Sequence, residues 1–547
     1  MSGWLDHLTI APIVVPLVVG ATMVLVGDRR RALNAALGIA SVLVLLALAI
    51  TLLVMADVDP PGPAAGTVRV YRLGDWPASF GIVLVLDRLA ALMLVLTALL
   101  GLAALVFSLA RWHRAGAYFQ PMFQFQLMGL NGAFLTGDLF NLFVFFEVML
   151  AASYGMALHG SGIARIRAGL HYVAINLTAS LLFLIGVSMI YGIAGTLNMA
   201  DLAARVAPMA GEDRALLEAG AAILGIAFLI KAGMWPVGFW LPTTYAAAGA
   251  APAAIMSILS KVGIYAVLRL WLLMFGEGAG VSAGFGGIWL TVGGLLTIAF
   301  GSLAVMATQN MARLAGSCIL VSSGTLLAAI GAGQVAVTGG ALFYLSSSVL
   351  AIGALFLLVE LVERGREVGA DVMAVSREAF GAGEDEEDEE DEVGVAIPAT
   401  MAILGLGFLT SALLLAGLPP LSGFLAKFAM LAPLFPRTGS AASLSSWVLL
   451  AALVLSGLAT IIAMTRAGID IFWASPAGEV PRIRVIEIAP VVMLLGLGLA
   501  LTVLAGPVMR YMEATAGMLH LPQDYVRSVV GPPRSGGGPR GAGCLIP

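Results

Sequence analysis

Long apolar runs follow one another from one end of the chain to the other, with short polar segments between them. A helix that crosses a bilayer needs about 20 apolar residues, so each such run predicts one membrane-spanning helix. We count about fourteen of them and no strand-rich segment, which predicts an all-α polytopic membrane protein. The runs lie at 9–27, 35–56, 81–110, 120–136, 138–159, 168–194, 216–247, 251–274, 284–307, 314–331, 339–362, 396–435, 446–465 and 485–508.

Two of these runs are interrupted. The run at 216–247 contains Pro236 and Pro242, and the run at 396–435 contains the segment 417–423, GLPPLSG. Proline removes a backbone hydrogen bond that lipid cannot replace, so we expect protein or water around both breaks. Each broken helix is the fourth of five if helices 4–8 form one unit and helices 9–13 another. Since five is odd, the second unit must be inverted, and matching breaks in two halves point to a transport site at mid-membrane.

This repeat divides the chain into four parts. We expect N-terminal helices at 1–115, a first unit at 116–275, a second inverted unit at 280–470, and a final helix with a flexible tail at 480–547. The second unit contains a loop at 363–395 with the acidic run Glu384–Glu392. Like charges repel and nothing apolar is available there to fold them, so this loop is expected to be solvated.

Composition supports a membrane protein. The chain is 60% hydrophobic and 11% charged, with a mean hydropathy of +1.00, too little polar surface for a soluble domain of this length. The net charge of -4 comes from the acidic run, so nucleic acid is not an expected partner. Cys318 and Cys544 lie too far apart for metal-ligand spacing or a disulfide framework.

The arginines predict an orientation. They cluster after odd-numbered helices, as in Arg29–Arg31 and Arg111, and basic residues in short loops favour the cytoplasm. With an even number of helices, both termini would then lie outside the cytoplasm, although the arginines from Arg510 onward would lie on that outer side. The first run lacks a basic region before it and a small-residue cleavage site after it, so we expect a retained helix.

Two charged residues inside the runs are the first candidates for function. Lys231 lies five residues before Pro236, and Glu147 lies near the middle of the run at 138–159. A lysine at the centre of a membrane helix costs roughly 2.5–3.5 kcal/mol on insertion scales, which favours a functional role. Glu147 has no partner beside it in the sequence, so we expect Lys231 to approach it, forming a group that binds and releases protons. The alternatives are a fixed ion pair, which adds little stability, and a lysine that snorkels to the interface.

Two further lysines extend this pattern. Lys261 follows Ser257 and Ser260 in the run at 251–274, and Lys427 follows the second break. Small residues and hydroxyls around a lysine predict a hydrated interior, where water would connect Lys231 to Lys261 and Lys427 would extend the relay to the other half. A single buried charge could be an accident of packing, but a carboxylate and three lysines on separate helices are hard to explain in that way.

Other charged residues are weaker candidates. Asp138 follows Thr136-Gly137 at a helix start, which favours an N-cap over a transport role. His159 and His171 flank the loop after the fifth helix and could pass protons to the site, although a histidine near a membrane surface is usually only solvated. Asp87 is expected to pair with Arg88 or to mark the interface.

Chemistry that needs a cofactor is not predicted. The sequence contains no Walker loop, no dinucleotide fingerprint in a strand–turn–helix unit, and no Cys or His cluster. We therefore expect no cofactor and no metal, and a transporter subunit rather than an enzyme.

Arg269, near the end of the eighth helix, is expected to snorkel, that is, to extend its charged group to the membrane interface.

Four segments resemble a known family. They are residues 137–147 (GDLFNLFVFFE), 231–236 (KAGMWP), 250–263 (AAPAAIMSILSKVG) and 417–427 (GLPPLSGFLAK). They are similar to the antiporter-like subunits shared by respiratory complex I, membrane-bound hydrogenases and Mrp multisubunit Na+/H+ antiporters, and the similarity covers the third to the thirteenth helix. The fifth helix and residues 465–473 (TRAGIDIFW) look most like the D-type subunit of the Mrp antiporters.

The resemblance implies roles for residues. Glu147 and Lys231 would form the pair of a first half-channel, Lys261 the central relay, and Lys427 the exit-side residue of the second half-channel. It also implies a bacterial inner-membrane complex in which the partners are a larger, A-type antiporter subunit, several small membrane subunits and the lipid bilayer.

One feature departs from the family pattern. Many relatives place a histidine in the eleventh helix, where this chain has Ser346, Ser347 and Ser348. Hydroxyl groups order water but do not hold a proton at neutral pH, so the departure leaves the link between Lys261 and Lys427 open.

Together these observations lead to the hypothesis of a proton-translocating subunit of a multisubunit Na+/H+ antiporter. The first alternative is a proton-pumping membrane subunit of a complex I-like quinone oxidoreductase or a hydrogenase. The second is a passive scaffold that packs other subunits and conducts nothing.

Overall fold

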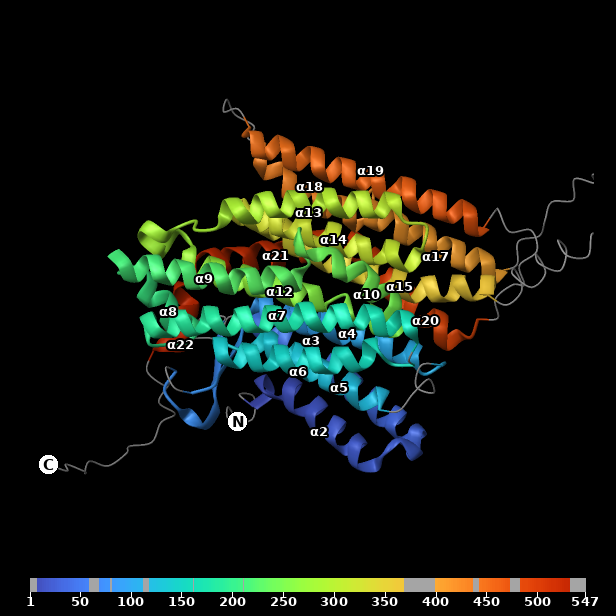
Figure 1. Ribbon diagram of the computed structural model, residues 1–547, viewed down its shortest axis with the longest axis horizontal. Helices are drawn as coiled ribbons and strands as arrows, with labels where there is room; N and C mark the ends of the chain where they lie inside the picture. The colour runs from blue at the N-terminus through green and yellow to red at the C-terminus, as the bar shows by residue number, and fades with distance from the viewer. Residues whose placement is uncertain are drawn as a thin grey trace, which may run out of the picture.

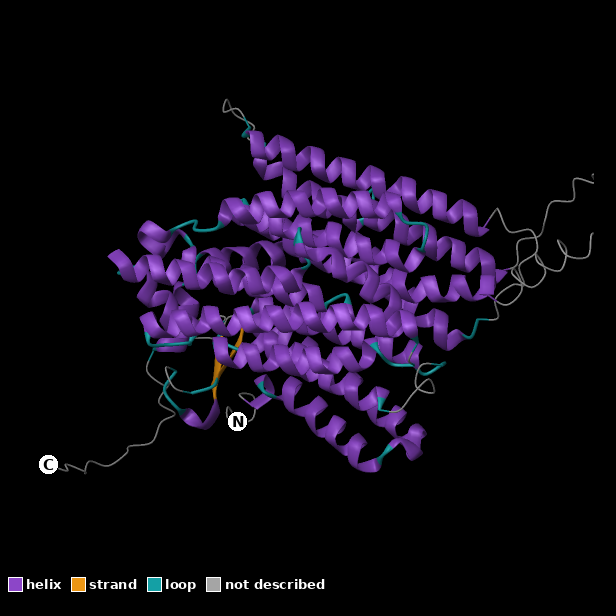
Figure 2. Cartoon of the chain, in the orientation of Figure 1, coloured by secondary structure: helices purple, strands orange, loops and turns teal. Residues whose placement is uncertain are grey.

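The computed structural model describes residues 7–58, 68–78, 81–111, 118–160, 162–209, 211–367, 399–435, 442–472 and 483–531. The acidic run Glu384–Glu392 and the tail after Gly531 lie outside the described residues, so the expectations for them stay untested. Nearly all of the described chain is helical (Figure 2), and the longer helices lie side by side along one common direction (Figure 1).

The helices are α2 (Ala11–Val26), α3 (Arg31–Asp57), α4 (Arg88–Ser108), α5 (Phe119–Leu135), α6 (Leu139–Ala157), α7 (Ile163–Ala194), α8 (Met199–Val206), α9 (Gly211–Ala232), α10 (Trp240–Ala248), α11 (Ala250–Met256), α12 (Leu259–Phe275), α13 (Gly287–Ala307), α14 (Met311–Gly331), α15 (Val335–Glu367), α17 (Ala399–Ala416), α18 (Ser422–Leu431), α19 (Leu444–Phe472), α20 (Val485–Val503), α21 (Ala505–His520) and α22 (Gln523–Val530). A small antiparallel hairpin, β1 (Arg69–Arg72) and β2 (Val83–Leu86), pairs Arg69 with Leu86 just before α4.

Within the described ranges, 12 helical segments are long and apolar enough to cross a membrane. This confirms the predicted polytopic helical membrane protein. The count of about fourteen stays a prediction, because α2 has only 16 residues and α5 only 17. The inverted relation of the two five-helix units also stays a prediction.

The most buried helices lie at the centre of the bundle. The apolar stretches of α11–α12, α14 and α15 are enclosed almost completely by other helices, whereas α3, α7, α13, α17, α19 and α20 present exposed apolar faces. In Figure 1, α12, α14 and α15 accordingly lie in the middle of the molecule. Polar side chains on these central helices therefore face protein and not lipid.

The two predicted breaks have the same local structure. The first helix of each pair ends on a glycine with a positive φ, Gly233 at 77° and Gly417 at 73°. The amide of the next residue then bonds back to the carbonyl five residues earlier, at 3.0 Å from Met234 to Leu229 and 3.1 Å from Leu418 to Leu413. This is the glycine-terminated closure that commonly ends a helix, and it satisfies carbonyls that lipid could not.

A third break was not predicted. The eighth run is divided at Ser257–Ile258 into α11 and α12, so Lys261 lies in the first turn of α12 and not in the middle of a helix. Here Ser257 donates its hydroxyl to the Ala254 carbonyl, and Ser260 donates to the Ser257 carbonyl. Such side-chain bonds compete with the helical ladder, which gives a physical reason for the interruption.

The bundle has two ends, and a charged residue marks each of them. The Asp87 end is where α4 begins and α12 ends, on the left in Figure 1, and the Arg364 end is where α15 ends, on the right.

Candidate functional site

The chain contains only three lysines, Lys231, Lys261 and Lys427, and all three are buried. Every other cationic side chain, apart from the histidines, is an arginine. A lysine ammonium can lose its proton in a buried site, whereas an arginine in a protein does not. All side chains of this chain that carry a releasable ammonium proton therefore lie in the interior of the bundle.

Lys231 lies at the C-terminal end of α9, immediately before the first break. It is 5% exposed, and its Nζ has no hydrogen-bond partner among the described residues. The negative end of the helix dipole favours a cation at this place, and the Phe146 ring lies with its centroid 5.1 Å from Nζ. A buried ammonium without a hydrogen-bond acceptor indicates a site that water fills or that the proton leaves.

Glu147 follows Phe146 on α6 and is half-buried. Its Oε1 accepts a hydrogen bond from Ser180 Oγ of α7, and within the described chain no ion pair joins it to Lys231. The two charges are still close enough to interact electrostatically. The expected partnership is thus an interaction at a distance and not a direct salt bridge.

Lys261 is fully buried and faces α14. Its Nζ donates to Ser322 Oγ at 3.0 Å and to Ser323 Oγ at 3.2 Å. The first turn of a helix is unfavourable for a cation, so these hydroxyl oxygens replace the stabilisation that Lys231 receives from its helix terminus. Neither serine was singled out from the sequence.

Lys231 and Lys261 lie on helices in close contact. A Cβ atom added to Gly263 would come within 2.6 Å of the Phe228 carbonyl and 2.9 Å of the Ala232 amide. The glycine thus allows the backbone of α12 to touch the last turn of α9, beside Lys231.

Hydroxyl groups continue from Lys261 toward the second broken helix. Ser322 Oγ donates to Ser348 Oγ of α15 at 3.0 Å, and the neighbouring Ser347 Oγ lies 2.8 Å from Ser422 Oγ at the start of α18. Ser422 also donates to the Gly498 carbonyl. Ser346 instead bonds back to the carbonyl of Leu342 in its own helix. Two of the three serines in the expected histidine position therefore face polar partners on other helices.

Lys427 lies in α18, after the second break. Its Nζ donates to the Ala416 carbonyl at 2.8 Å, at the C-terminal end of α17. Gly417 and Gly457 leave the space that the ammonium occupies, since their added Cβ atoms would lie 3.0 and 3.4 Å from Nζ. Cys318 of α14 is buried nearby. Each break thus has a lysine at the C-terminal end of the helix before it. Lys231 belongs to that helix itself, whereas Lys427 belongs to the helix that follows the break and reaches back to it.

The weaker candidates lie away from the lysines. Asp138 is the N-cap of α6, with Oδ1 accepting from the Asn141 amide at 3.0 Å, as expected. At the Arg364 end, His159 is buried with its ring 5.1 Å from that of Phe119, and His171 is exposed on α7.

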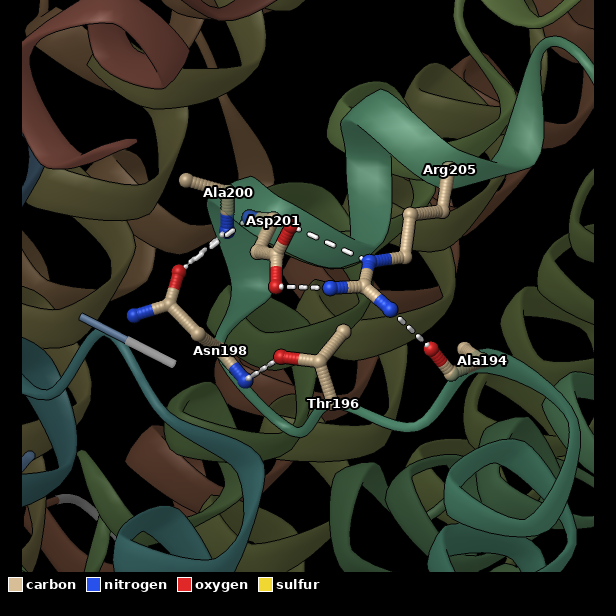
Figure 3. A network of polar contacts seen from close by, with 6 residues as sticks. All are labelled: Ala194, Thr196, Asn198, Ala200, Asp201 and Arg205. Carbon is tan, nitrogen blue, oxygen red and sulfur yellow. Dashed lines mark hydrogen bonds and ion pairs between the residues drawn. The ribbon is translucent and has the colours of Figure 1, made fainter. Parts of the chain in front are cut away.

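A polar network holds the loop beside Asp138. Asn198 Oδ1 accepts from the amides of Ala200 and Asp201 at the start of α8, and Arg205 binds both carboxylate oxygens of Asp201, at 3.1 and 2.9 Å (Figure 3). The same loop pairs with the residues around Asp138 through the bond from the Leu139 amide to the Leu197 carbonyl. This end of α6 is therefore fixed by backbone and capping bonds.

Two expectations for arginine and aspartate were wrong. Asp87 pairs with Arg269 of α12, 182 residues away, and not with Arg88. Arg269 is only 5% exposed, so it does not snorkel. Arg88 instead pairs with Asp57. A contact over this sequence distance leaves no local signal in the sequence.

The arrangement suits the movement of protons. The interior contains three titratable lysines, and hydroxyl groups that both donate and accept hydrogen bonds extend from Lys261 toward the second broken helix. Among the described residues, no group of three or more His, Cys, Asp and Glu side chains is placed to hold a metal ion.

Comparison with known proteins identifies the family. Residues 136–460 match the family described as NADH:quinone oxidoreductase/Mrp antiporter, TM. The chain is 59% identical over 541 residues to a protein of Rhizobium meliloti named as the probable D subunit of a K(+)/H(+) antiporter, covering 98% of this chain and 100% of the relative. It is 34% identical over 532 residues to the D subunit of the Na(+)/H(+) antiporter of Alkalihalophilus pseudofirmus, covering 96% and 100%.

Solved structures of related membrane complexes contain chains with the same fold. A chain of the Mrp complex from Dietzia sp. DQ12-45-1b aligns with a TM-score of 0.80 and 26% identity, covering 97% of this chain and 100% of that one. A chain of respiratory complex I from Thermus thermophilus has a TM-score of 0.71 and 22% identity, covering 96% and 100%, which shows a shared fold. The chain therefore belongs to the family of membrane subunits shared by NADH:quinone oxidoreductases and Mrp antiporters.

Proposed function

We propose that this chain is the D-type subunit of an Mrp-like monovalent cation/H+ antiporter and that it carries the proton. The observation that supports this most directly is the placement of all three lysines inside the bundle, with hydroxyl groups between Lys261 and the second broken helix. The two relatives named as D subunits of antiporters match along nearly the whole chain. Other subunits of such a complex would be its partners.

The proposed path runs along the middle of the membrane. Glu147 changes the proton affinity of Lys231 through their electrostatic interaction, and the proton passes through water to Lys261 on the touching helix. Ser322 and Ser348, then Ser347 and Ser422, order the hydroxyls and water that lead toward Lys427.

The transported cation is proposed only as a monovalent one. The relative with 59% identity is named for K+ and the one with 34% identity for Na+. The buried lysines repel cations, so we propose that Na+ or K+ moves elsewhere in the assembly. From the family we also propose a bacterial inner-membrane location. From the arginine distribution we propose that both termini, and the Asp87 end, lie outside the cytoplasm.

The test uses Lys231→Met and Glu147→Gln in the assembled complex. Membrane vesicles should lose proton flux that depends on added Na+ or K+, while co-purification of the other subunits stays normal. The control is Thr178→Val on α7, an exposed position whose hydroxyl only bonds back to the Ala174 carbonyl in its own helix. Normal cation-dependent flux in either the lysine or the glutamate variant would refute the proposal.

The complex I-like alternative has a simple discriminator. A chain that serves an antiporter should co-purify with membrane proteins alone, whereas a chain that serves an oxidoreductase should co-purify with soluble iron–sulfur proteins.

A further inference from the structure

The ion pair between Asp87 and Arg269 lies outside the path described so far. Both side chains are 5% exposed, and the guanidinium contacts both carboxylate oxygens, with Nη2 2.8 Å from Oδ1. Asp87 Oδ1 also accepts from the Ala90 amide at 2.9 Å, because Asp87 is the N-cap of α4. A buried pair of this kind adds little net stability, so it invites a functional explanation.

Arg269 is held from three sides. Its Nε donates to the Tyr265 hydroxyl at 3.2 Å, and its Cζ lies 5.2 Å from the Tyr265 ring centroid and 5.3 Å from that of Tyr525. Tyr525 belongs to α22, which covers the pair. Arg72 fixes α22 by donating to the carbonyls of Val529 and Gly531. The C-terminal helices therefore form a cover over the pair.

A cavity of about 30 Å³ lies directly against the pair. This volume is sufficient for one water molecule, which needs two to four polar partners. The polar residues in its lining are Asp87, Arg88, Arg269, Thr515, Asp524 and Tyr525. Water can therefore approach the pair from the Asp87 end.

On the inner side, the pair faces the central lysine along one helix. Lys261, Tyr265 and Arg269 follow each other at intervals of four residues on α12, so they share one face. The residues between them are apolar, as in Val262 and Ala266. At 1.5 Å per residue, Arg269 lies about 12 Å along the axis from Lys261.

We propose that the Asp87–Arg269 pair is the seal of a proton access route between Lys261 and the aqueous space at the Asp87 end. This inference rests on the proposed function, since it assumes that Lys261 carries a transported proton. In the closed state seen here, Arg269 occupies the space between the cavity and Tyr265. When the pair separates, water from the cavity extends along this face of α12, and the Lys261 ammonium gives its proton to that water, leaving the neutral amine.

The proposal gives a reason for the buried Asp87–Arg269 pair, whose desolvation costs free energy. A permanently hydrated route to a central relay would let protons cross without the cation, so an antiporter needs the route to be closed by default. An arginine suits this purpose because it keeps its charge and its five donors bind a carboxylate and a hydroxyl together.

The test measures passive proton leak in proteoliposomes that contain the whole complex. A pH difference is imposed in choline buffer without Na+ or K+, and an internal pH dye reports its decay. Asp87→Asn and Arg269→Gln should each leak several-fold faster than the wild type, and the exchanged pair Asp87→Arg/Arg269→Asp should restore a slow leak. The matched control is Asp201→Asn, which removes another ion pair at the same end (Figure 3) and should leave the leak unchanged.

A second substitution tests whether the route leads to Lys261. Adding Lys261→Met to Asp87→Asn should return the leak to the wild-type rate. If the double variant leaks as fast as Asp87→Asn alone, or if both single variants leak at the wild-type rate, the access route is overturned. In either case, cation-dependent antiport by the wild type would still support the proposed function. A leak that depends on Lys261 in a complex without any antiport supports the route and refutes the proposed function.

Assembly can also fail when a buried pair is changed. In that case hydrogen exchange of the wild-type complex decides the question. The amides of residues 265–269 should exchange several-fold faster when antiport is driven by a cation gradient, and unchanged protection would overturn the proposal.

Discussion

At the scale of single residues, different contacts stabilise the buried ammonium group of each lysine. Lys231 uses a helix terminus and an aromatic ring, Lys261 uses two hydroxyls, and Lys427 uses the free carbonyl of Ala416. Hydrogen bonds to a charged group contribute about 1.5–3 kcal/mol each, less than the cost of a fully buried bare ion. The contacts of each lysine therefore compensate only in part for the hydration that its ammonium group loses on burial.

Ser322 is the residue that distinguishes a connected relay from one in which Lys261 acts alone. Ser322→Ala removes an acceptor of Lys261 and the bond to Ser348 together, while Ser323 still accepts from Lys261. The loss of one charged hydrogen bond, about 1.5–3 kcal/mol, should slow cation-dependent proton flux by about tenfold or more. Vesicle antiport assays at equal protein amounts measure this.

The control for this substitution is Ser302→Ala on α13. That hydroxyl only bonds back to the Ile298 carbonyl in its own helix, so flux should stay within the error of the wild type. Equal flux in the two variants would show that Ser322 has no part in the path.

The charged residues could be predicted from the sequence because a charge in an apolar run is conspicuous by itself. Their partners could not. Ser322 lies 61 residues from Lys261, and serines within membrane helices are common packing residues, so nothing local separates Ser322 from its neighbours. The same reason explains the wrong expectation for Arg269, whose partner belongs to another helix far away in the chain.

At the scale of the elements, interruptions of helices position the lysines. The two breaks with prolines were predicted, because proline is incompatible with a continuous helix. The break before Lys261 was not, because serine hydroxyls can either follow a helix or compete with its ladder, and only tertiary packing decides. All three lysines lie within a few residues of such a break, or directly against one.

The contact of α12 with α9 gives a prediction at this scale. Gly263→Ala would place a Cβ atom 2.6 Å from the Phe228 carbonyl, so α12 must move away from the last turn of α9. Overpacking of this kind costs about 1–3 kcal/mol, and it widens the gap between Lys231 and Lys261. We expect antiport to fall severely, with a lower thermal unfolding temperature of the purified complex.

Gly192→Ala is the matched control. This glycine lies in α7, and nothing lies within 4 Å of an added Cβ. Its replacement should leave both antiport and unfolding unchanged. Should Gly263→Ala lower stability but leave antiport at the wild-type level, the α9–α12 contact would be only a packing contact.

At the scale of the whole molecule, the buried central helices connect the elements that carry the site. Lys261 of α12 donates to Ser322 of α14, and Ser347 of the central α15 meets Ser422 at the second break. Figure 1 shows α12, α14 and α15 together in the middle of the bundle. The two broken helices and the central helices thus share one interior, and the proposed relay can be tested as one unit.

A relay in series makes a specific prediction about combined substitutions. If protons must pass Lys231, Lys261 and Lys427 in turn, then replacing any one of them with Met removes an obligatory step. Each single variant should reduce cation-dependent flux to the level of empty vesicles, and a double variant cannot fall further. Residues that act as a unit show this strong non-additivity, whereas independent contributions multiply. Methionine keeps much of the apolar stem of lysine, so assembly should persist and can be checked by co-purification. Residual flux that drops stepwise from single to double to triple variants would mean parallel routes, and unchanged flux in the triple variant would mean that the chain is a passive scaffold.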